Sequence, residues 1–169
     1  RLDERDYTAL HWRGRTLVRL GQYDEALADL QQAGAIGVGA GVTGVGQAFE
    51  AMADAADLLA LTDPDAGFAY LAGPIIEYGS RPPLLVGIAR CYWRNGNGTQ
   101  ALLYLDSLVR EDHLPALFWR AQVHLDYRRE YEAIQDLQAY LAVYRAGPLA
   151  EEARALLAGL GAEEEPEEE

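Results

Sequence analysis

The feature that most constrains the fold of this chain is a pattern of paired amphipathic helices that recurs along it. In residues 4–33, small and apolar side chains recur at the helical period, stop at Gly21, and resume from Tyr23. The same layout returns at 84–109 and at 114–141. Because one hairpin cannot bury its apolar faces alone, we expect the hairpins to stack on one another.

A weaker copy of the pattern occupies residues 42–72. Its first half predicts a helix with one buried face, since apolar residues recur at alternating steps of three and four. Pro64 is expected to start a second helix, because proline is well tolerated in the first helical turn. Gly73-Pro74 is expected to end that helix, and residues 75–83 to form a connector.

The chain ends with one more predicted helix and an acidic tail. After Gly147-Pro148, the segment LAEEARALLAGL places leucine and alanine on one helical face. In a stacked array, such a helix covers the apolar face of the last hairpin. The final residues carry six glutamates. We therefore expect one helical repeat domain over 1–161 and an acidic disordered tail over 162–169.

The segment WRGRTLVRLGQYDEALADLQQA, which ends at Ala33, carries its small and large residues in a specific order. Gly14 stands three residues before Leu17, and the later matches are Gly21, Tyr23, Ala26, Leu30 and Ala33. In this order the segment resembles a tetratricopeptide repeat. The second-helix alanines Ala26, Ala66, Ala101 and Ala133 are 40, 35 and 32 residues apart, near the family period of ~34. Two departures are Gly98, where the family has an aromatic residue, and His124, where a large apolar residue is usual.

The resemblance implies an all-α fold. We expect a right-handed α-solenoid of about four TPR-like helix-turn-helix repeats with a C-terminal capping helix. Proteins of this family bind extended peptides in a concave groove that is lined by the first helices of successive repeats. The resemblance therefore implies a non-catalytic scaffold that binds a protein or peptide partner.

In the family, the residues one and five places after the small residue face the groove. At these places the chain has Arg15 and Arg19 in one copy, and Arg90 and Arg94 in another. Trp93 adjoins the second pair, and His11 extends the stripe of the first. Because arginine forms bidentate hydrogen bonds with carboxylates, these six residues are our candidate site for an acidic segment or a C-terminal carboxylate.

The alternative is internal neutralisation of the arginines. The copy between the two arginine pairs carries Glu50, Asp54 and Asp57 on its first helix. These carboxylates could form structural ion pairs with the arginines and leave nothing for a partner.

The formal net charge of -13 disfavours a nucleic-acid partner or an anionic membrane surface, because both would repel the chain. No stretch reaches the ~20 apolar residues of a membrane-spanning helix. All 14 basic residues are arginine, which indicates a GC-rich bacterial genome. The single cysteine, Cys91, excludes an internal disulfide.

We find no pattern that predicts catalysis, a cofactor or a metal site. GAGVTG at 39–44 fits a dinucleotide fingerprint, but no strand precedes it, so we interpret it as a loop leading to a helix from Val42. No histidine pairs with Cys91 or with another histidine at metal-ligand spacing. Cys91 also lacks a nearby base and is interpreted as structural.

Two alternatives to partner binding in the groove remain open. The chain could be a structural subunit of a larger bacterial assembly, such as an envelope or appendage apparatus, and bind through its edges or ends. It could also be a fragment of a larger enzyme or regulator, since it starts at Arg1. Homo-oligomers are compatible with either alternative. The cytoplasm and, after removal of a leader, the periplasm both remain open.

Overall fold

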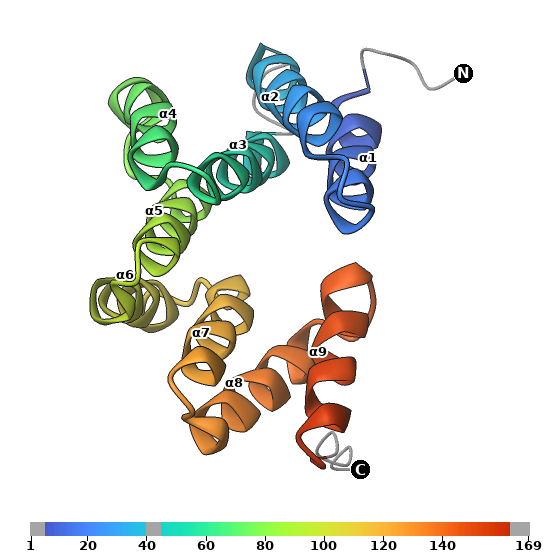
Figure 1. Cartoon of the computed structure of the whole chain (residues 1–169), viewed down its shortest axis with the longest axis vertical. Coiled ribbons are helices and arrows are strands. Elements are labelled where there is room, and N and C mark those ends of the chain that lie inside the picture. Colours follow the sequence, from blue (N-terminus) through green and yellow to red (C-terminus); the bar gives the residue numbers. More distant parts are fainter. Residues whose placement is uncertain (1–5, 40–44, 163–169) are drawn as a thin grey trace. The chain divides into compact units, whose positions relative to one another are not determined.

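The computed structural model describes residues 6–39 and 45–162, and these residues form helices joined by short turns, with no strand among them (Figure 1). The all-α class predicted from helical periodicity is therefore confirmed. In chain order the helices are α1 (Tyr7–Arg19), α2 (Tyr23–Gly39), α3 (Val45–Ala60), α4 (Pro64–Tyr78), α5 (Pro82–Arg94), α6 (Gly98–Arg110), α7 (Pro115–Asp126), α8 (Glu130–Val143) and α9 (Pro148–Gly159).

The chain divides into two compact units. Unit 1 runs from Arg1 to Asn97 and contains α1 to α5, whereas unit 2 runs from Gly98 to Glu169 and contains α6 to α9. The division falls inside the hairpin predicted at 84–109, so its two helices belong to different units. Each unit is described by itself below.

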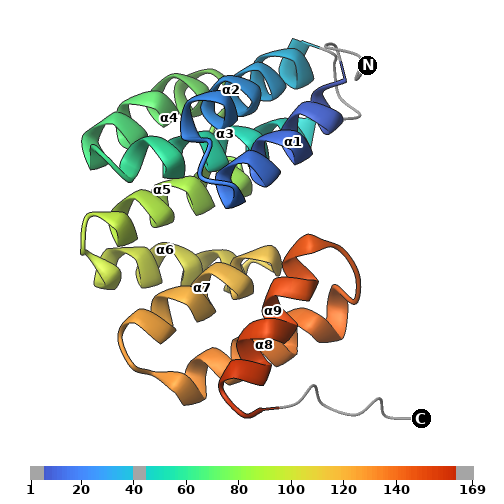
Figure 2. The same ribbon diagram turned by 45° about the vertical axis from the view of Figure 1, so that its right-hand side comes forward.

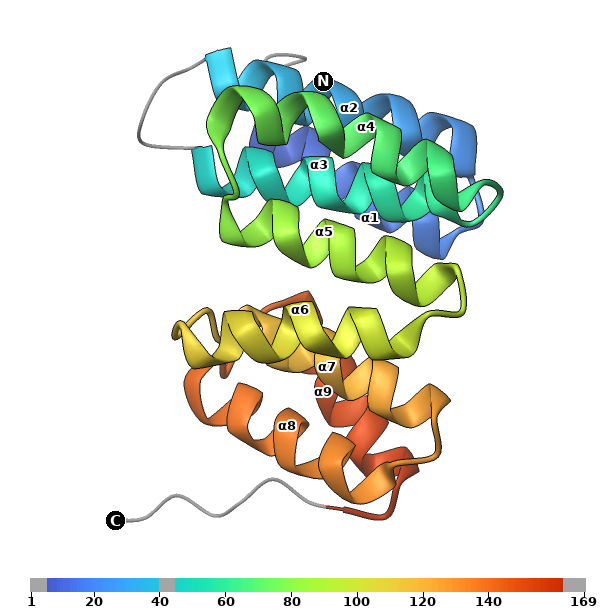
Figure 3. The ribbon, with the colours of Figure 1, turned by 90° about the vertical axis from the view of Figure 1, so that its left-hand side faces the viewer.

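Helix α3 is the centre of unit 1. It packs against α1, α2, α4 and α5, and Figure 3 shows α3, α4 and α5 side by side. This crowding is achieved with small side chains, because the buried face of α3 is rich in alanine. Small residues allow helix axes to approach closely, and the larger Phe49 and Met52 fill the remaining space.

Helix α2 is longer than the sequence pattern indicates. The predicted hairpin ended near residue 33, but α2 continues to Gly39. A Cβ atom on Gly34 would lie 2.7 Å from Cγ of Met52, and one on Gly37 would lie 2.7 Å from Cβ of Ala48. These two glycines therefore allow α2 to pack tightly on α3, which offsets the usual cost of about 1 kcal/mol for glycine inside a helix.

The predicted end of α4 at Gly73-Pro74 is wrong. The helix continues through Pro74 to Tyr78 and ends at Gly79, whose positive φ of 78° suits glycine. Proline removes one helical hydrogen bond, but the extra turn packs Tyr78 against Phe49, with ring centroids 5.5 Å apart. Tertiary packing thus compensates for an unfavourable local residue.

The repeat register in α4 also differs by one residue from the prediction. The buried small residue is Gly67 and not Ala66, which is only partly buried. A Cβ on Gly67 would lie 2.7 Å from the carbonyl oxygen of Ala56, so only glycine fits there.

Unit 2 is built around the α7–α8 pair, with α9 packed against α8 (Figure 2). Its core contains the fully buried Phe118 from α7 and Leu137 from α8. Ala153 and Leu157 of α9 join the same core. The amphipathic last helix predicted from the sequence is therefore confirmed, and it covers apolar side chains of the preceding pair.

The first residue of α6 is capped by a side chain that is distant in the sequence. Threonine is a common N-cap residue, but the helix already begins at Gly98, one residue before Thr99. The backbone N–H of Gly98 donates to the hydroxyl of Tyr127 at 2.9 Å. A Cβ on Gly98 would overlap the Tyr127 ring. The phenol of Tyr127 thus takes the space that an aromatic residue at Gly98 would need.

We expect Gly98→Ala to lower the free energy of unfolding by about 1–3 kcal/mol, because the added methyl would displace the Tyr127 ring. Urea unfolding measures this. Gly159→Ala, at a helical glycine with no atom near the added methyl, is the matched control and should be neutral or slightly stabilising. Equal effects of the two changes would contradict the proposed contact.

Candidate binding surface

Four of the six candidate residues contact aspartates on α3. His11 and Arg15 reach them from α1, and Arg90 and Arg94 reach them from α5. The carboxylates that they contact are those of Asp54 and Asp57. We call the set of His11, Arg15, Arg90, Arg94, Asp54 and Asp57 the ion-pair cluster. The internal ion pairs that were the alternative expectation are therefore present in the structure.

Arg90 is the structural centre of the ion-pair cluster. Its Nη1 donates to Oδ1 of Asp54 at 2.5 Å, and its Nη2 donates to Oδ2 of Asp57 at 2.7 Å. The two aspartates are three residues apart and therefore share one face of α3, which presents both to a single guanidinium. The arginine is buried, so these bonds join α5 to α3 with little access for solvent.

The remaining members surround this centre. Arg94 makes a bidentate contact with Asp57, with Nε and Nη2 at 2.9 and 3.1 Å from its oxygens. On the other side, Nε2 of the fully buried His11 lies 2.9 Å from Oδ2 of Asp54. Nε of Arg15 lies 3.6 Å from the same oxygen. The cluster therefore links three helices, α1, α3 and α5.

The electrostatic environment holds both aspartates in their charged form. Burial alone would raise the pKa of each carboxyl, and it is the largest single effect. The charge of Arg90, together with Arg15 and His11 at Asp54 and with Arg94 at Asp57, outweighs it and lowers both pKa values. The same contacts raise the pKa of Arg90. Glu50, although it exposes surface to solvent, has a raised pKa because of partial desolvation, to which the charge of Asp54 adds.

The lowered pKa of Asp54 predicts that the stability of the fold depends on pH. The pKa of Asp54 is lower in the folded than in the unfolded protein. The carboxylate therefore stabilises the fold at pH values above the ordinary pKa of aspartate, and this stabilisation is lost as the pH falls toward the folded-state pKa. We expect the stability gap between the wild type and Asp54→Asn to narrow by about 1 kcal/mol between pH 7 and pH 3. Urea unfolding across that range measures it. Asp106→Asn, at an exposed carboxylate, should show a smaller change, and a constant gap for Asp54→Asn would contradict the assignment.

The outer rim of the cluster carries two arginine–tryptophan contacts. The guanidinium of Arg94 lies 4.7 Å from the ring centroid of Trp93, and that of Arg15 lies 5.4 Å from the centroid of Trp12. Trp12, which was not among our predicted residues, is partly exposed. Such cation–π contacts restrain the arginine side chains at the surface.

Exposure separates the predicted arginines into two groups. The side chains of Arg94 and Arg15 are 32% and 18% exposed, whereas that of Arg90 is 7% exposed. Arg19 is exposed in the last turn of α1, where the helix dipole favours a positive charge. Contact with a partner is therefore sterically open to Arg15, Arg19 and Arg94.

Sequence analysis missed an arginine–aspartate pair that occurs in both units. In α1 and α2, Arg13 contacts Asp29 through Nε and Nη2, and in α7 and α8, Arg120 contacts Asp136 through the same two atoms. Both pairs span 16 residues. The sequence did contain a signal for this pair, namely an Arg and an Asp at the same spacing in both helical pairs. A search for apolar periodicity does not detect charged residues of this kind.

Cys91 is buried, and burial raises the pKa of its thiol to about 12. We therefore expect no measurable reaction with a disulfide reagent at about pH 8 in the native protein and full reaction after unfolding. A spectrophotometric thiol assay in buffer and in denaturant measures both. Rapid reaction of the native protein would contradict the structural role of Cys91.

The other features considered for chemistry add no site. Among residues 6–39 and 45–162, no three His, Cys, Asp or Glu side chains are grouped as ligands of a metal ion. Within the same residues, no helix combines the length and apolarity needed to cross a membrane. Gly39, the first residue of the GAGVTG segment, ends α2. The rest of the segment, including Val42, lies outside the described residues.

No family model matches the sequence, and comparison with curated proteins and with solved structures gives no match either. The tetratricopeptide resemblance therefore stays a prediction.

Proposed function

We propose that this chain is a non-catalytic module of the tetratricopeptide type that binds a protein or peptide partner on the α1–α3–α5 face of unit 1. The observation that carries the proposal is the pair of arginine–tryptophan contacts at the rim of the ion-pair cluster. Their arginines are tethered to aspartates on one side and partly exposed on the other. Tethering lowers the entropy that a partner would otherwise have to remove on binding.

The chemistry of this face favours a partner with a carboxylate. Arg15, Arg90 and Arg94 contact Asp54 and Asp57, and Glu50 interacts with Arg15, so the three guanidinium groups balance the three carboxylates. Of these arginines, Arg15 and Arg94 are the accessible ones, and guanidinium groups bind carboxylates through paired hydrogen bonds. We assign Arg90 a structural role, and we assign contact with an acidic segment or a C-terminal carboxylate to the other two.

The repeat architecture is part of the proposal. The α1–α2 and α7–α8 pairs share the same buried positions, with Ala26 and Leu30 matching Ala133 and Leu137. They also share the arginine–aspartate pair at the same spacing. Recurrence of both features in two helical pairs supports a common repeat of the tetratricopeptide kind.

Affinity capture from a bacterial lysate tests the proposed function. The wild-type chain is compared with the Arg15→Gln/Arg94→Gln variant, which leaves the buried Arg90 in place. The Arg128→Gln/Arg129→Gln variant, on the α7–α8 turn, removes the same charge and serves as control. A protein retained by the wild type and the control but lost by the first variant, with all three folded by circular dichroism, supports the proposal. Equal retention by all three places binding elsewhere on the chain.

A further inference from the structure

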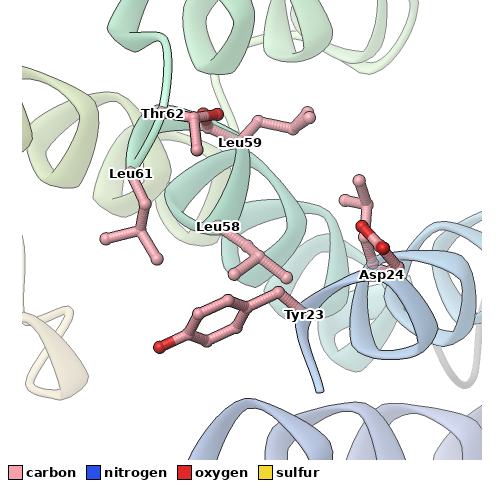
Figure 4. Close-up of a pocket in the computed structure, with 7 residues that line it drawn as sticks. Tyr23, Asp24, Leu58, Leu59, Leu61 and Thr62 are labelled. Carbon is pink, nitrogen blue, oxygen red and sulfur yellow. The ribbon is translucent and has the colours of Figure 1, made fainter. Parts of the chain in front are cut away.

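A second surface of unit 1 has the features of a docking site. A cavity of about 420 Å³ opens where α2 begins and α3 ends (Figure 4). Leu58 forms part of its lining from α3, and the ring of Tyr23 lies beside it. Leu61 and Asp24 lie on different sides of the opening. The lining is mostly apolar, with a carboxylate at its edge.

The apolar side chains around this cavity are unusually accessible. Tyr23 is 51% exposed and Leu61 is 44% exposed. Leu20, at the end of α1 and three residues before Tyr23, is also exposed. Single exposed apolar residues are ordinary, but two that line one concave opening are typical of an interaction surface.

The charges near the opening indicate what kind of segment fits it. Asp24 lines the cavity, and Glu25 follows it in the first turn of α2. Beyond Leu61, the exposed Asp63 is the N-cap of α4 and Asp65 lies in its first turn; Oδ1 of Asp63 accepts from the backbone N–H of Asp65. Of these four carboxylates Asp24 lines the cavity itself, and the other three stand one to three residues from the lining residues Asp24 and Thr62 in the sequence. The chain segments that border the cavity are therefore rich in carboxylates.

We propose that this cavity binds a cationic amphipathic segment of a partner protein. One large apolar side chain of the segment enters the cavity, and flanking lysine or arginine residues contact Asp24 and Glu25. A second copy of this chain is the poorer occupant, since a molecule with a net charge of -13 is repelled by an acidic edge. The inference concerns a surface separate from the arginine rim and stands independently of the function proposed above.

Three labelled synthetic peptides of equal length test the proposal by fluorescence polarisation at physiological salt. The first has a Phe-Leu pair flanked on both sides by lysine and arginine. The second keeps these charges but has serine in place of Phe and Leu, and the third keeps Phe and Leu but has glutamate in place of the bases. We expect the first peptide to bind at least about tenfold more tightly than either of the others.

Variants locate the binding. Leu61→Ser and Tyr23→Ala should each weaken binding of the first peptide about tenfold, because they remove apolar contact at the opening without disturbing the core. Leu103→Ser, at an exposed leucine of α6, is the matched control and should leave binding unchanged. Asp24→Asn should weaken binding about threefold and reduce its dependence on salt.

Four outcomes would overturn the inference. These are equal binding of the first and second peptides, no binding of the first peptide, an equal loss in Leu61→Ser and Leu103→Ser, and self-association in sedimentation that Leu61→Ser abolishes. The last outcome would make a second copy the occupant. The Arg15→Gln/Arg94→Gln variant should keep its affinity for the first peptide, so failure of this inference and failure of the proposed function are distinguishable.

Discussion

Replacing Arg90 with alanine is expected to lower the free energy of unfolding by about 3–5 kcal/mol. Arg90 is the buried cation between Asp54 and Asp57, so its removal leaves two carboxylates with little solvent and a weaker positive field. Breaking a buried ion pair on one side is costly because the remaining charge must be hydrated or protonated. Urea unfolding followed by circular dichroism measures the change.

Arg129→Ala provides the control for this prediction. Arg129 pairs with Glu132 at 3.0 Å on the surface of α8, where both side chains are largely hydrated. An exposed pair of this kind contributes about 1 kcal/mol or less. If Arg90→Ala cost no more than Arg129→Ala, the ion-pair cluster would not hold α3 and α5 together in the way described above.

Phe118→Ala is expected to lower the free energy of unfolding by about 3–5 kcal/mol. Phe118 of α7 is fully buried, and its ring packs against the rings of Trp119 and Tyr140. Truncation removes that burial and leaves a cavity in the core that α7, α8 and α9 share. Thermal and urea unfolding both measure the loss.

Leu103→Ala, at an exposed position of α6, should change stability by about 0.5 kcal/mol or less. A small effect of Phe118→Ala, close to that of this control, would mean that unit 2 does not depend on the observed core.

The helices were predictable from sequence because their signals are local. Apolar periodicity and the turn at Gly21 predicted the α1–α2 pair, Pro64 predicted the start of α4, and apolar periodicity predicted α9. The errors arose where distant residues decide the outcome. Pro74 is accommodated because Tyr78 packs against Phe49, and Gly98 begins α6 because Tyr127 caps it.

The candidate surface was predictable in part. The family resemblance placed Arg90 and Arg94 on one face, and the first helix of the copy between the arginine pairs supplied the competing carboxylates Glu50, Asp54 and Asp57. Which arginine would be buried between them depends on how α5 packs against α3, and a single sequence does not contain that information in its periodicity. Trp12 was missed for a different reason: it stands three residues before Arg15 in α1, a spacing that brings side chains together on a helix, but the sequence analysis considered only the family's groove positions.

The most direct test of the proposed function is a titration of the captured partner against three chains by isothermal calorimetry. These are the wild type, Arg15→Gln/Arg94→Gln, and the charge-matched Arg128→Gln/Arg129→Gln. The account predicts about tenfold or greater weakening in the first variant, with a weaker dependence on salt, and unchanged affinity in the second. Equal affinity for all three chains, or an equal loss in both variants, would contradict recognition by the arginine–tryptophan rim.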